Sequence, residues 1–373
     1  MKQLNNQKTI LVLGGYGTFG SRIVKALCAK GYILLINGRN KAKAEGLLQR
    51  ILKDQQDAKV KEACFDVFIE LNQQLQNIKP DLVIHCCGPF QDQDTKTAET
   101  IIAAGIHYID LSDGRGYCQN ILKLNALAKQ TKVTAITGAS TVPTLSSAVL
   151  LYLQKRYCIE NFESVRIGIS PGQKTSRGLA TTQAVLSYVG KPLKPWPGLN
   201  KTKFGWQDTY LQPYPGIKNR LMGNCESADL DLLQSHFPIE NLCFSAGMES
   251  KLLHTLIWMA SWLVRAGLPL KLANHASFLL SISRRFDFLG SQDGGMHVHI
   301  KATDINGRFI NKTWYIIAKQ NDGPQIPSIP AIVLADKILN QNIPTGARSS
   351  VNEVNLPEYL DALNDSAIQT LIL

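Results

Sequence analysis

A glycine-rich turn between an apolar stretch and an amphipathic stretch constrains the fold of this chain more than any other feature. Residues 9–20 read TILVLGGYGTFG, so a short aliphatic run is followed at once by the spacing G-x-G-x-x-G at Gly15, Gly17 and Gly20. Residues 21–30 then place apolar side chains at helical spacing. A strand, a glycine turn and a helix in this order predict a dinucleotide-binding site.

Each glycine of this turn has a physical role in such a site. Gly15 permits the tight turn, Gly17 lets the backbone approach a pyrophosphate, and Gly20 lets the helix pack close to the strand. The N–H groups of the first helical turn then face the phosphates. We therefore expect cofactor contacts along the whole turn, from Gly14, Gly15, Tyr16, Gly17, Thr18, Phe19 and Gly20.

The end of the second apolar stretch, residues 31–37, indicates which dinucleotide binds. Sites for NAD usually carry an acid about twenty residues after the glycines, where it binds the ribose 2′-hydroxyl. Here Asn37, Gly38, Arg39 and Asn40 follow one another, without an acid. The guanidinium of Arg39 suits a 2′-phosphate because its planar fork pairs bidentately with phosphate oxygens. We expect NADP(H) in preference to NAD(H), bound by Arg39 and Asn40; a solvated surface position is the alternative for Arg39.

Apolar stretches continue to alternate with helical stretches as far as residue 137. Segments 60–65, 81–86, 107–111 and 132–137 read as strands, which predicts a parallel sheet with right-handed crossovers. The fold class is therefore α/β, with a Rossmann doubly wound parallel sheet in residues 1–145. Ligands of such sheets bind at the carboxyl ends of the strands. We expect Cys87, Gly88, Pro89 and Phe90 to lie at that edge.

Polar residues follow the third and fifth strands. Asp66 either accepts a hydrogen bond from the adenine amino group or caps the next helix. At the end of the fifth strand, from residue 110 onward, a carboxylate is suited to relay a proton and a guanidinium is suited to anchor an anionic substrate. The candidate catalytic residues are Asp110, Asp113, Arg115 and Tyr117. For Asp113, capping the helix that begins near Gly116 is the alternative.

The pattern changes after about residue 146. Stretches 165–169, 242–246, 296–302 and 313–318 read as strands of a second α+β domain, residues 146–325, with a mostly antiparallel sheet. We expect residues 326–373 to form C-terminal helices that pack back on the first domain, including the tail 356–373.

Two groups of residues in the second domain are candidates for binding. Lys174 and Arg177 either close over a cleft to bind an anion or are ordinary surface charges. His297 and His299 share one strand face without a third ligand nearby, so no metal site is expected.

Composition narrows the class of partner. The formal net charge is +11, yet the basic residues are scattered, without an arginine-rich arm or a zinc-finger spacing, so we expect no nucleic-acid partner. Eight cysteines without C-x-x-C spacing, and a polar N-terminus without a signal peptide, indicate a cytoplasmic protein.

Segment 252–270 is apolar but interrupted by His254 and Arg265. We expect a buried or interface helix there, and surface membrane contact is the less favoured alternative.

The order of these turns resembles the saccharopine dehydrogenase-like reductases, as found in uncharacterised bacterial members. The resemblance rests on GGYGTFG, IHCCGPF, AGIHYIDLSD and TGASTVP in the first 150 residues, and extends through SRGLATTQAVLSYVG. It implies an NAD(P)-binding Rossmann domain joined to an α/β substrate and dimerisation domain. Gly15, Gly17 and Gly20 match the family's phosphate turn, and Arg39 matches the basic residue of NADP-using members. Residues 88–90 match the loop beside the nicotinamide.

These observations together predict a homodimeric oxidoreductase that transfers a hydride between NADP(H) and a small imine, carbonyl or enoyl substrate, anionic in character. The sequence departs from the family after the fifth strand, where many relatives have G-E and this chain has residues 112–115, S-D-G-R. The alternative is a cofactor-binding regulatory or scaffold protein without turnover. Such a protein would dock on a membrane or a partner through segment 252–270.

Overall fold

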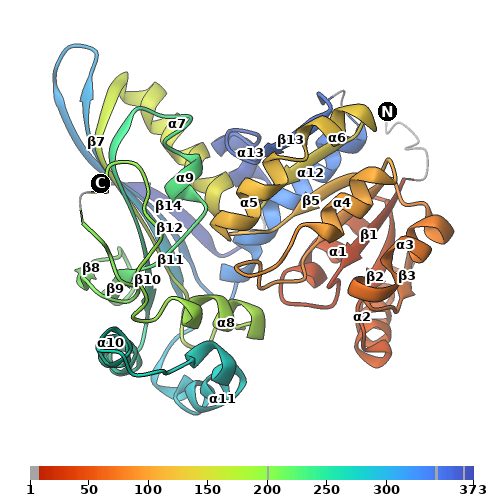
Figure 1. Cartoon of the computed structure of the whole chain (residues 1–373), viewed down its shortest axis with the longest axis horizontal. Coiled ribbons are helices and arrows are strands. Elements are labelled where there is room, and N and C mark those ends of the chain that lie inside the picture. Colours follow the sequence, from red (N-terminus) through yellow and green to blue (C-terminus); the bar gives the residue numbers. More distant parts are fainter. Residues whose placement is uncertain (1–7, 200, 341–342, 364–365) are drawn as a thin grey trace. The chain divides into compact units, whose positions relative to one another are not determined.

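The computed structural model describes residues 8–199, 201–340, 343–363 and 366–373 (Figure 1). The chain forms two compact units, each built from two stretches of sequence. The first comprises residues 1–144 and 327–354, and the second comprises residues 145–326 and 355–373.

The first unit is built on a parallel sheet of seven strands in the order β13-β6-β5-β4-β1-β2-β3. Every neighbouring pair is parallel. The change of direction in strand order therefore falls between β1 and β4, and ligands of doubly wound sheets bind beyond the carboxyl ends of the strands at such a point. The strands are β1 (Thr9–Leu13), β2 (Ile33–Asn37), β3 (Val60–Ala63), β4 (Leu82–His85), β5 (His107–Asp110), β6 (Thr134–Thr137) and β13 (Gly346–Ser349).

Helices cover the sheet of the first unit because its strands are apolar on both faces: Ile10, Leu11, Val12 and Leu13 are all fully buried. Helix α3 packs beside α4 and α4 beside α6, whereas α1 packs beside α12. The helices are α1 (Gly20–Ala29), α2 (Lys41–Asp54), α3 (Val67–Ile78), α4 (Lys96–Ala103), α5 (Arg115–Leu122), α6 (Asn125–Gln130) and α12 (Ile329–Asn340).

The second unit is built on a mixed sheet in the order β14-β12-β11-β7-β10-β9-β8. All neighbours are antiparallel except β7 and β10, which are parallel, so the predicted mostly antiparallel sheet is confirmed. The strands are β7 (Ile159–Ser170), β8 (Tyr210–Gln212), β9 (Arg220–Asn224), β10 (Ile239–Met248), β11 (Gly294–Asp304), β12 (Phe309–Ala318) and β14 (Ile368–Ile372).

Side chains alternate between the two faces of this second sheet. Val165, Ile167 and Val298 are buried on the face against which α7 packs, while Arg166 and Lys301 are exposed. Helices α8, α10 and α11 form a separate cluster with Trp206 and Leu186 at its centre. The helices of the unit are α7 (Ser146–Tyr157), α8 (Leu179–Ser187), α9 (Asp229–Leu232), α10 (Lys251–Arg265), α11 (Ala276–Arg285) and α13 (Leu356–Asp361).

The prediction for the C-terminal segment is wrong for its last part. Helix α12 and strand β13 do belong to the first unit, but residues 355–373 belong to the second. The chain end forms strand β14, which pairs antiparallel with β12 from Trp314 opposite Ile372 to Ala318 opposite Ile368. The physical reason is that β12 would otherwise be an edge strand with unpaired backbone groups, which an extended apolar tail satisfies.

Candidate cofactor-binding site

The glycine turn closes at the carboxyl end of β1 in the way its spacing predicts. Gly14 has a φ of +72°, and Gly17 N–H donates to the Gly14 carbonyl at 2.9 Å. Gly15 N–H donates to the Asn37 carbonyl at 2.9 Å, which joins the turn to the end of β2. A Cβ atom on Gly20 would lie 2.4 Å from the Gly14 oxygen. No side chain fits there without moving backbone, so the contact between α1 and the turn requires glycine.

Three consecutive backbone donors at this turn are left without an internal acceptor. The N–H groups of Thr18, Phe19 and Gly20 form no hydrogen bond to the described residues of the chain. Helix α1 begins at Gly20 and carries no acidic residue in its first turn. Free N–H groups at a helix N-terminus bind phosphate because the donors and the helix dipole both favour an anion. The chain therefore fits the pyrophosphate of a dinucleotide here.

Tyr16 connects this turn to the residues that follow β2. Its hydroxyl accepts a hydrogen bond from Asn40 N–H at 3.1 Å. Its ring lies so close to Gly38 that a Cβ atom at residue 38 would be 2.1 Å from a ring carbon. Asn40 in turn caps α2, where its side chain accepts from Lys43 N–H at 3.0 Å. The predicted contacts Tyr16 and Asn40 therefore lie together, with a glycine between them that cannot be replaced without displacing the tyrosine.

Arg39 extends from the same turn into solvent. Its side chain is 80% exposed, and its Nη1 lies 4.0 Å from Asp66 Oδ2. Asp66 caps α3, with its Oδ1 accepting from Phe68 N–H at 2.9 Å, so the capping alternative is observed for this residue. An exposed ion pair at this distance contributes little stability. The guanidinium thus keeps most of its donors available for a ligand at the end of β2.

The loop after β4 lies against the glycine turn, as strand order requires. A Cβ atom at Gly14 would be 3.1 Å from Cys87 Sγ. Burial raises the pKa of Cys87 to about 12, so this thiol stays protonated and packs as a small apolar group. Phe90 is 5% exposed, and its ring centroid lies 5.0 Å from that of Tyr117. The structure brings Cys87 beside Gly14 and buries the Phe90 ring against Tyr117.

Asp110 ends β5 and is fully buried. Its Oδ1 accepts three hydrogen bonds of 2.9 Å, from Ser112 N–H, Gly138 N–H and the Thr137 hydroxyl. Burial raises the pKa of Asp110 to about 6, although the bonds from Gly138 and Ser112 act in the opposite direction. Through these hydrogen bonds the Asp110 carboxyl connects the turn after β5 to the turn after β6, so its role is to position these turns.

Tyr117 lies in the interior of the same unit. It is 1% exposed, and its hydroxyl pairs with Tyr108 Oη at 2.8 Å. Tyr108 Oη also lies 3.1 Å from His85 Nδ1. Burial lowers the pKa of His85 to about 3, so the imidazole is neutral at physiological pH. The three side chains form a buried polar cluster beneath the strand ends, which supports the edge from inside.

The other two candidate catalytic residues, Asp113 and Arg115, lie at the start of α5. Asp113 is partly exposed and accepts from Gln91 Nε2 at 2.9 Å. Burial raises its pKa, and the bond from Gln91 opposes that rise. The N-cap of α5 is Gly114, so Asp113 does not cap this helix. Arg115 is the first residue of α5 and is 5% exposed.

The family comparison covers this unit. Residues 10–136 match the saccharopine dehydrogenase NADP-binding domain. This match lies wholly within the first unit and covers about a third of the chain. The matched residues contain the glycine turn, Arg39, the loop after β4 and the start of α5, so the predicted family and its NADP-binding domain are confirmed. No curated protein sequence is significantly similar to the chain.

Two solved structures are similar over nearly the whole length. Apo saccharopine dehydrogenase (L-Glu forming) from Saccharomyces cerevisiae has a TM-score of 0.65 at 13% identity, covering 98% of this chain and 100% of that one. An amine dehydrogenase from Mycobacterium smegmatis has a TM-score of 0.50 at 12% identity, covering 94% and 97%. At these identities the likeness shows the fold. Residues 10–136 thus match an NADP-binding domain, and the whole chain has a fold similar to that of these two dehydrogenases.

Sequence reasoning missed two features of this domain. Gly38 was noted only because an acid is absent there, yet the Tyr16 ring excludes any side chain at that position. The contacts of His85 with Tyr108 and Tyr117 are the second feature, because they join residues of three different elements. The alternation of β5, which places Tyr108 and Asp110 on one face, was the available signal for the second feature.

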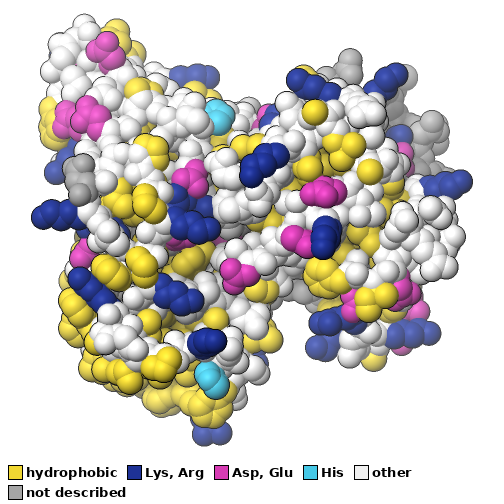
Figure 2. Space-filling view, viewed as in Figure 1, with side chains coloured by type: hydrophobic (Ala, Val, Ile, Leu, Met, Phe, Trp, Pro, Cys, Tyr) yellow, Lys and Arg dark blue, Asp and Glu magenta, His cyan; other side chains and the backbone are white. Residues whose placement is uncertain are grey.

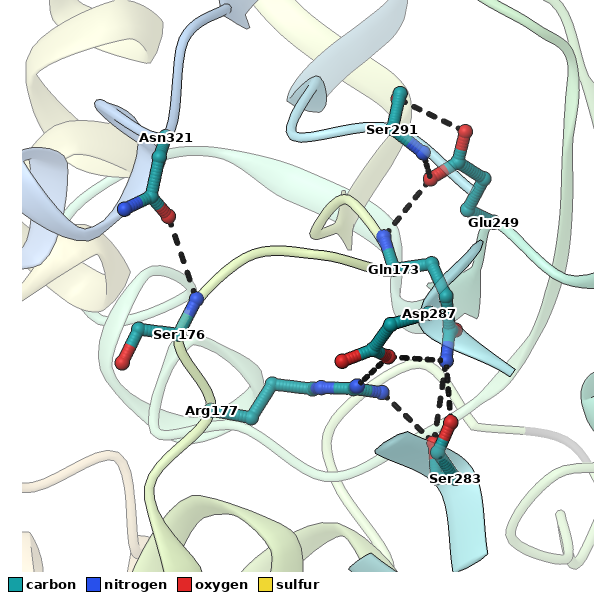
Figure 3. Close-up of polar contacts among 8 residues, drawn as sticks. All are labelled: Gln173, Ser176, Arg177, Glu249, Ser283, Asp287, Ser291 and Asn321. Atoms are coloured by element: carbon teal, nitrogen blue, oxygen red, sulfur yellow. Dashed lines mark hydrogen bonds and ion pairs between the residues drawn. The ribbon is translucent and has the colours of Figure 1, made fainter. Parts of the chain in front are cut away.

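The loop after β7 in the second unit is held by polar contacts on both sides, as Figure 3 shows. Arg177 Nη2 lies 2.5 Å from Asp287 Oδ1, and its Nη1 donates to Ser283 Oγ at 2.8 Å. The Arg177 side chain is only 16% exposed. This guanidinium therefore stabilises the loop itself, whereas Lys174 is exposed.

The second unit also contains a buried carboxyl that makes stability depend on pH. Asp229 is fully buried, and its Oδ1 accepts from Ser146 Oγ at 2.8 Å. Its Oδ2 has no hydrogen-bond partner among the described residues. Burial raises the pKa of Asp229 to about 7, against about 3.9 in an unfolded chain. Between these values the folded state binds more protons than the unfolded state, so Asp229 makes folding less favourable as pH rises.

We expect Asp229→Asn to remove this dependence, because the amide keeps the shape without a charge. The free energy of unfolding of the natural chain should fall relative to the variant as pH rises from 4 to 7, by up to about 1.4 kcal/mol per pH unit. Thermal denaturation of both proteins at pH 5 and 7.5 measures the difference. Asp57→Asn, at an exposed position, is the control. A difference between Asp229→Asn and the natural chain that stays constant with pH would contradict the assignment.

Proposed function

We propose that this protein is an NADP(H)-dependent oxidoreductase that transfers a hydride between the nicotinamide and a small imine, carbonyl or enoyl substrate. The observation that carries the proposal is the row of unpaired N–H groups at Thr18, Phe19 and Gly20, next to an exposed guanidinium at residue 39. The first feature suits a pyrophosphate and the second a 2′-phosphate. The match of residues 10–136 to an NADP-binding domain supports both assignments.

The roles of the residues follow from their positions on the edge of the sheet. Residues 18–20 hold the pyrophosphate, Arg39 and Asn40 hold the 2′-phosphate side, and the loop of residues 87–90 borders the nicotinamide half. Bound NADP(H) supplies or accepts the hydride. Asp113 is the proposed proton relay, since its pKa is raised and it is partly exposed. Arg115 is the proposed anchor for an anionic substrate group, and Asp110 and Tyr117 position this segment.

Replacement of Arg39 tests the choice of cofactor. We expect Arg39→Ala to weaken NADPH binding about 10- to 100-fold, because a charge-assisted bidentate contact with the 2′-phosphate is lost. Binding of NADH should change little, since it has no 2′-phosphate. Isothermal titration with both nucleotides measures the two effects, and Arg50→Ala, an exposed arginine of α2, is the control. Equal losses for NADPH and NADH would rule out the assigned contact.

Turnover separates an enzyme from a cofactor-binding scaffold. We expect NADPH oxidation with at least one member of a panel of cyclic imines, aldehydes, ketones and enoyl thioesters. Asp113→Asn should lower kcat about 10²- to 10⁴-fold while NADPH affinity is kept, as is typical of a lost proton relay. NADPH binding without oxidation across the panel would favour the scaffold. Unchanged kcat in Asp113→Asn would reject this residue as the relay.

A cytoplasmic homodimer that acts on an anionic substrate is part of the same proposal. The family resemblance supports the dimer, and eight cysteines without a disulfide among the described residues fit a reducing compartment. Light scattering coupled to size exclusion measures the mass in solution. A monomer at micromolar concentration would reject the dimer without affecting the cofactor site.

A further inference from the structure

Helices α10 and α11 of the second unit present a surface of exposed apolar side chains, which we call the α10–α11 surface. Segment 252–270 is therefore not a buried helix: only Leu253, His254 and Ser261 of α10 are buried. The exposed side chains of the surface are each between 40% and 72% accessible. They are Leu252, Leu256, Met259, Trp262, Leu263, Leu268, Leu270, Phe278, Phe288 and Leu289. Figure 2 shows hydrophobic side chains gathered over this part of the second unit, with basic side chains among them.

The exposed stripe is additional to what the fold requires. The inner side of α10 already packs Ile257 and Ala260 against the cluster around Trp206. Leu252, Leu256 and Leu263 lie on the opposite side, at the spacing of a single helical stripe. Contiguous exposed apolar surfaces of this kind mark sites of protein or membrane interaction.

Charge identifies the kind of partner. Residues 251–289 include five Lys or Arg residues, Lys251, Arg265, Lys271, Arg284 and Arg285, and a single acid, Asp287, which pairs with Arg177. All of these except Arg265 are free of ion pairs and hydrogen bonds from their side chains to the described residues. Arg265 donates to Gln207 Oε1 at 2.7 Å and lies over the Phe204 ring at 4.0 Å. A segment with four unpaired cations and one acid that is already paired attracts an anionic partner.

We propose that the α10–α11 surface docks on a lipid bilayer that contains anionic headgroups. Leucine, tryptophan and phenylalanine side chains enter the boundary between headgroups and acyl chains, and lysine and arginine side chains contact the phosphates. A second copy of the chain fits less well, since two such surfaces would bring their unpaired cations together. No helix in the described part of the chain is long and apolar enough to cross a membrane. The helices therefore lie on the bilayer.

Vesicle flotation tests the proposal on the full chain. We expect co-flotation with phosphatidylcholine vesicles that contain phosphatidylglycerol, and little with pure phosphatidylcholine. The double variant Trp262→Ser, Phe278→Ser should bind at least about tenfold more weakly, because it removes two interfacial aromatic side chains. Ile305→Ser, Phe309→Ser is the matched control, since these residues are 66% and 59% exposed on the β11–β12 hairpin. Circular dichroism shows whether each variant is folded.

Two further measurements separate lipid from other partners. Lys271→Glu, Arg284→Glu should lower affinity for anionic vesicles at least about 25-fold, at roughly fivefold for each cation lost. Lys123→Glu, Lys129→Glu, just after α5 and on α6 of the first unit, changes the net charge by the same amount and should have a much smaller effect. Absence of flotation in the natural chain overturns the proposal. The proposal is also overturned if the natural chain is a dimer that does not bind vesicles and the double variant Trp262→Ser, Phe278→Ser is a monomer.

Discussion

Replacing Gly20 by alanine is expected to abolish measurable NADPH binding, with an affinity loss of at least about 100-fold. The added Cβ would lie 2.4 Å from the Gly14 oxygen and 2.9 Å from the Gly15 Cα. Either the turn or the start of α1 must move, and both carry the donors that face the pyrophosphate. Displacement of about 1 Å is enough to lose several aligned hydrogen bonds. The same overpacking should destabilise the unit by about 1–3 kcal/mol.

Gly46 provides the matched control for this variant. It lies inside α2, and an added Cβ would meet nothing within 4 Å. Gly46→Ala should leave NADPH affinity unchanged and stabilise the helix by up to about 1 kcal/mol. Titration calorimetry and thermal denaturation of both variants give the two quantities. If Gly20→Ala binds NADPH as tightly as Gly46→Ala, the turn is not the phosphate site.

Glu249→Ala is expected to lower the stability of the second unit by about 3–5 kcal/mol. Glu249 Oε2 accepts from Gln173 N–H and Ser291 N–H, each at 2.8 Å, and Oε1 accepts from Ser291 Oγ at 2.9 Å (Figure 3). Arg220 Nη2 lies 3.8 Å from Oε1, with an unexposed side chain. Burial alone would raise the pKa of Glu249, but these bonds and the Arg220 charge lower it. Alanine would therefore leave two backbone donors without their acceptor and remove the opposite charge beside the buried Arg220 guanidinium.

Tryptophan fluorescence measures this unfolding selectively, because Trp196, Trp206, Trp258, Trp262 and Trp314 all belong to the second unit. Glu249→Gln keeps an acceptor oxygen and should cost less than Glu249→Ala. Glu160→Ala, at an exposed position of β7, should stay within about 0.5 kcal/mol of the natural chain. A denaturant midpoint for Glu249→Ala equal to that of Glu160→Ala would show that the Glu249 contacts contribute nothing.

The nucleotide-binding half was predictable because its signals are local. The glycines of residues 14–20, the missing acid after β2 and the alternation of strands with helices each act within a few residues of the chain. Asp110 and Tyr117 were predicted to be catalytic because they lie at and after the end of β5, and their burial could not be predicted from that position. Position along a strand indicates an edge of the sheet, but the direction of the side chain there depends on neighbours such as Gly138 and Tyr108, which come from other elements.

Long-range pairing explains what the sequence did not predict. Strand β13 joins the parallel sheet through β6, more than 200 residues earlier, in the register that places Gly346 opposite Thr134. Strand β14 joins β12 although helices were predicted there. The Glu249 network brings together segments that are 42 and 76 residues apart along the chain. No periodicity in the sequence identifies such partners, because they are selected by the packing of the whole unit.

Titration of the natural chain with NADPH and with NADH, under the same conditions, tests the central claim most directly. The claim is that the edge between β1 and β4 binds NADP(H) through the N–H groups of residues 18–20 and the Arg39 guanidinium. It predicts micromolar NADPH affinity and binding of NADH that is at least about tenfold weaker, since NADH lacks the phosphate that Arg39 pairs with. Equal affinities for the two nucleotides, or tighter binding of NADH, would contradict it.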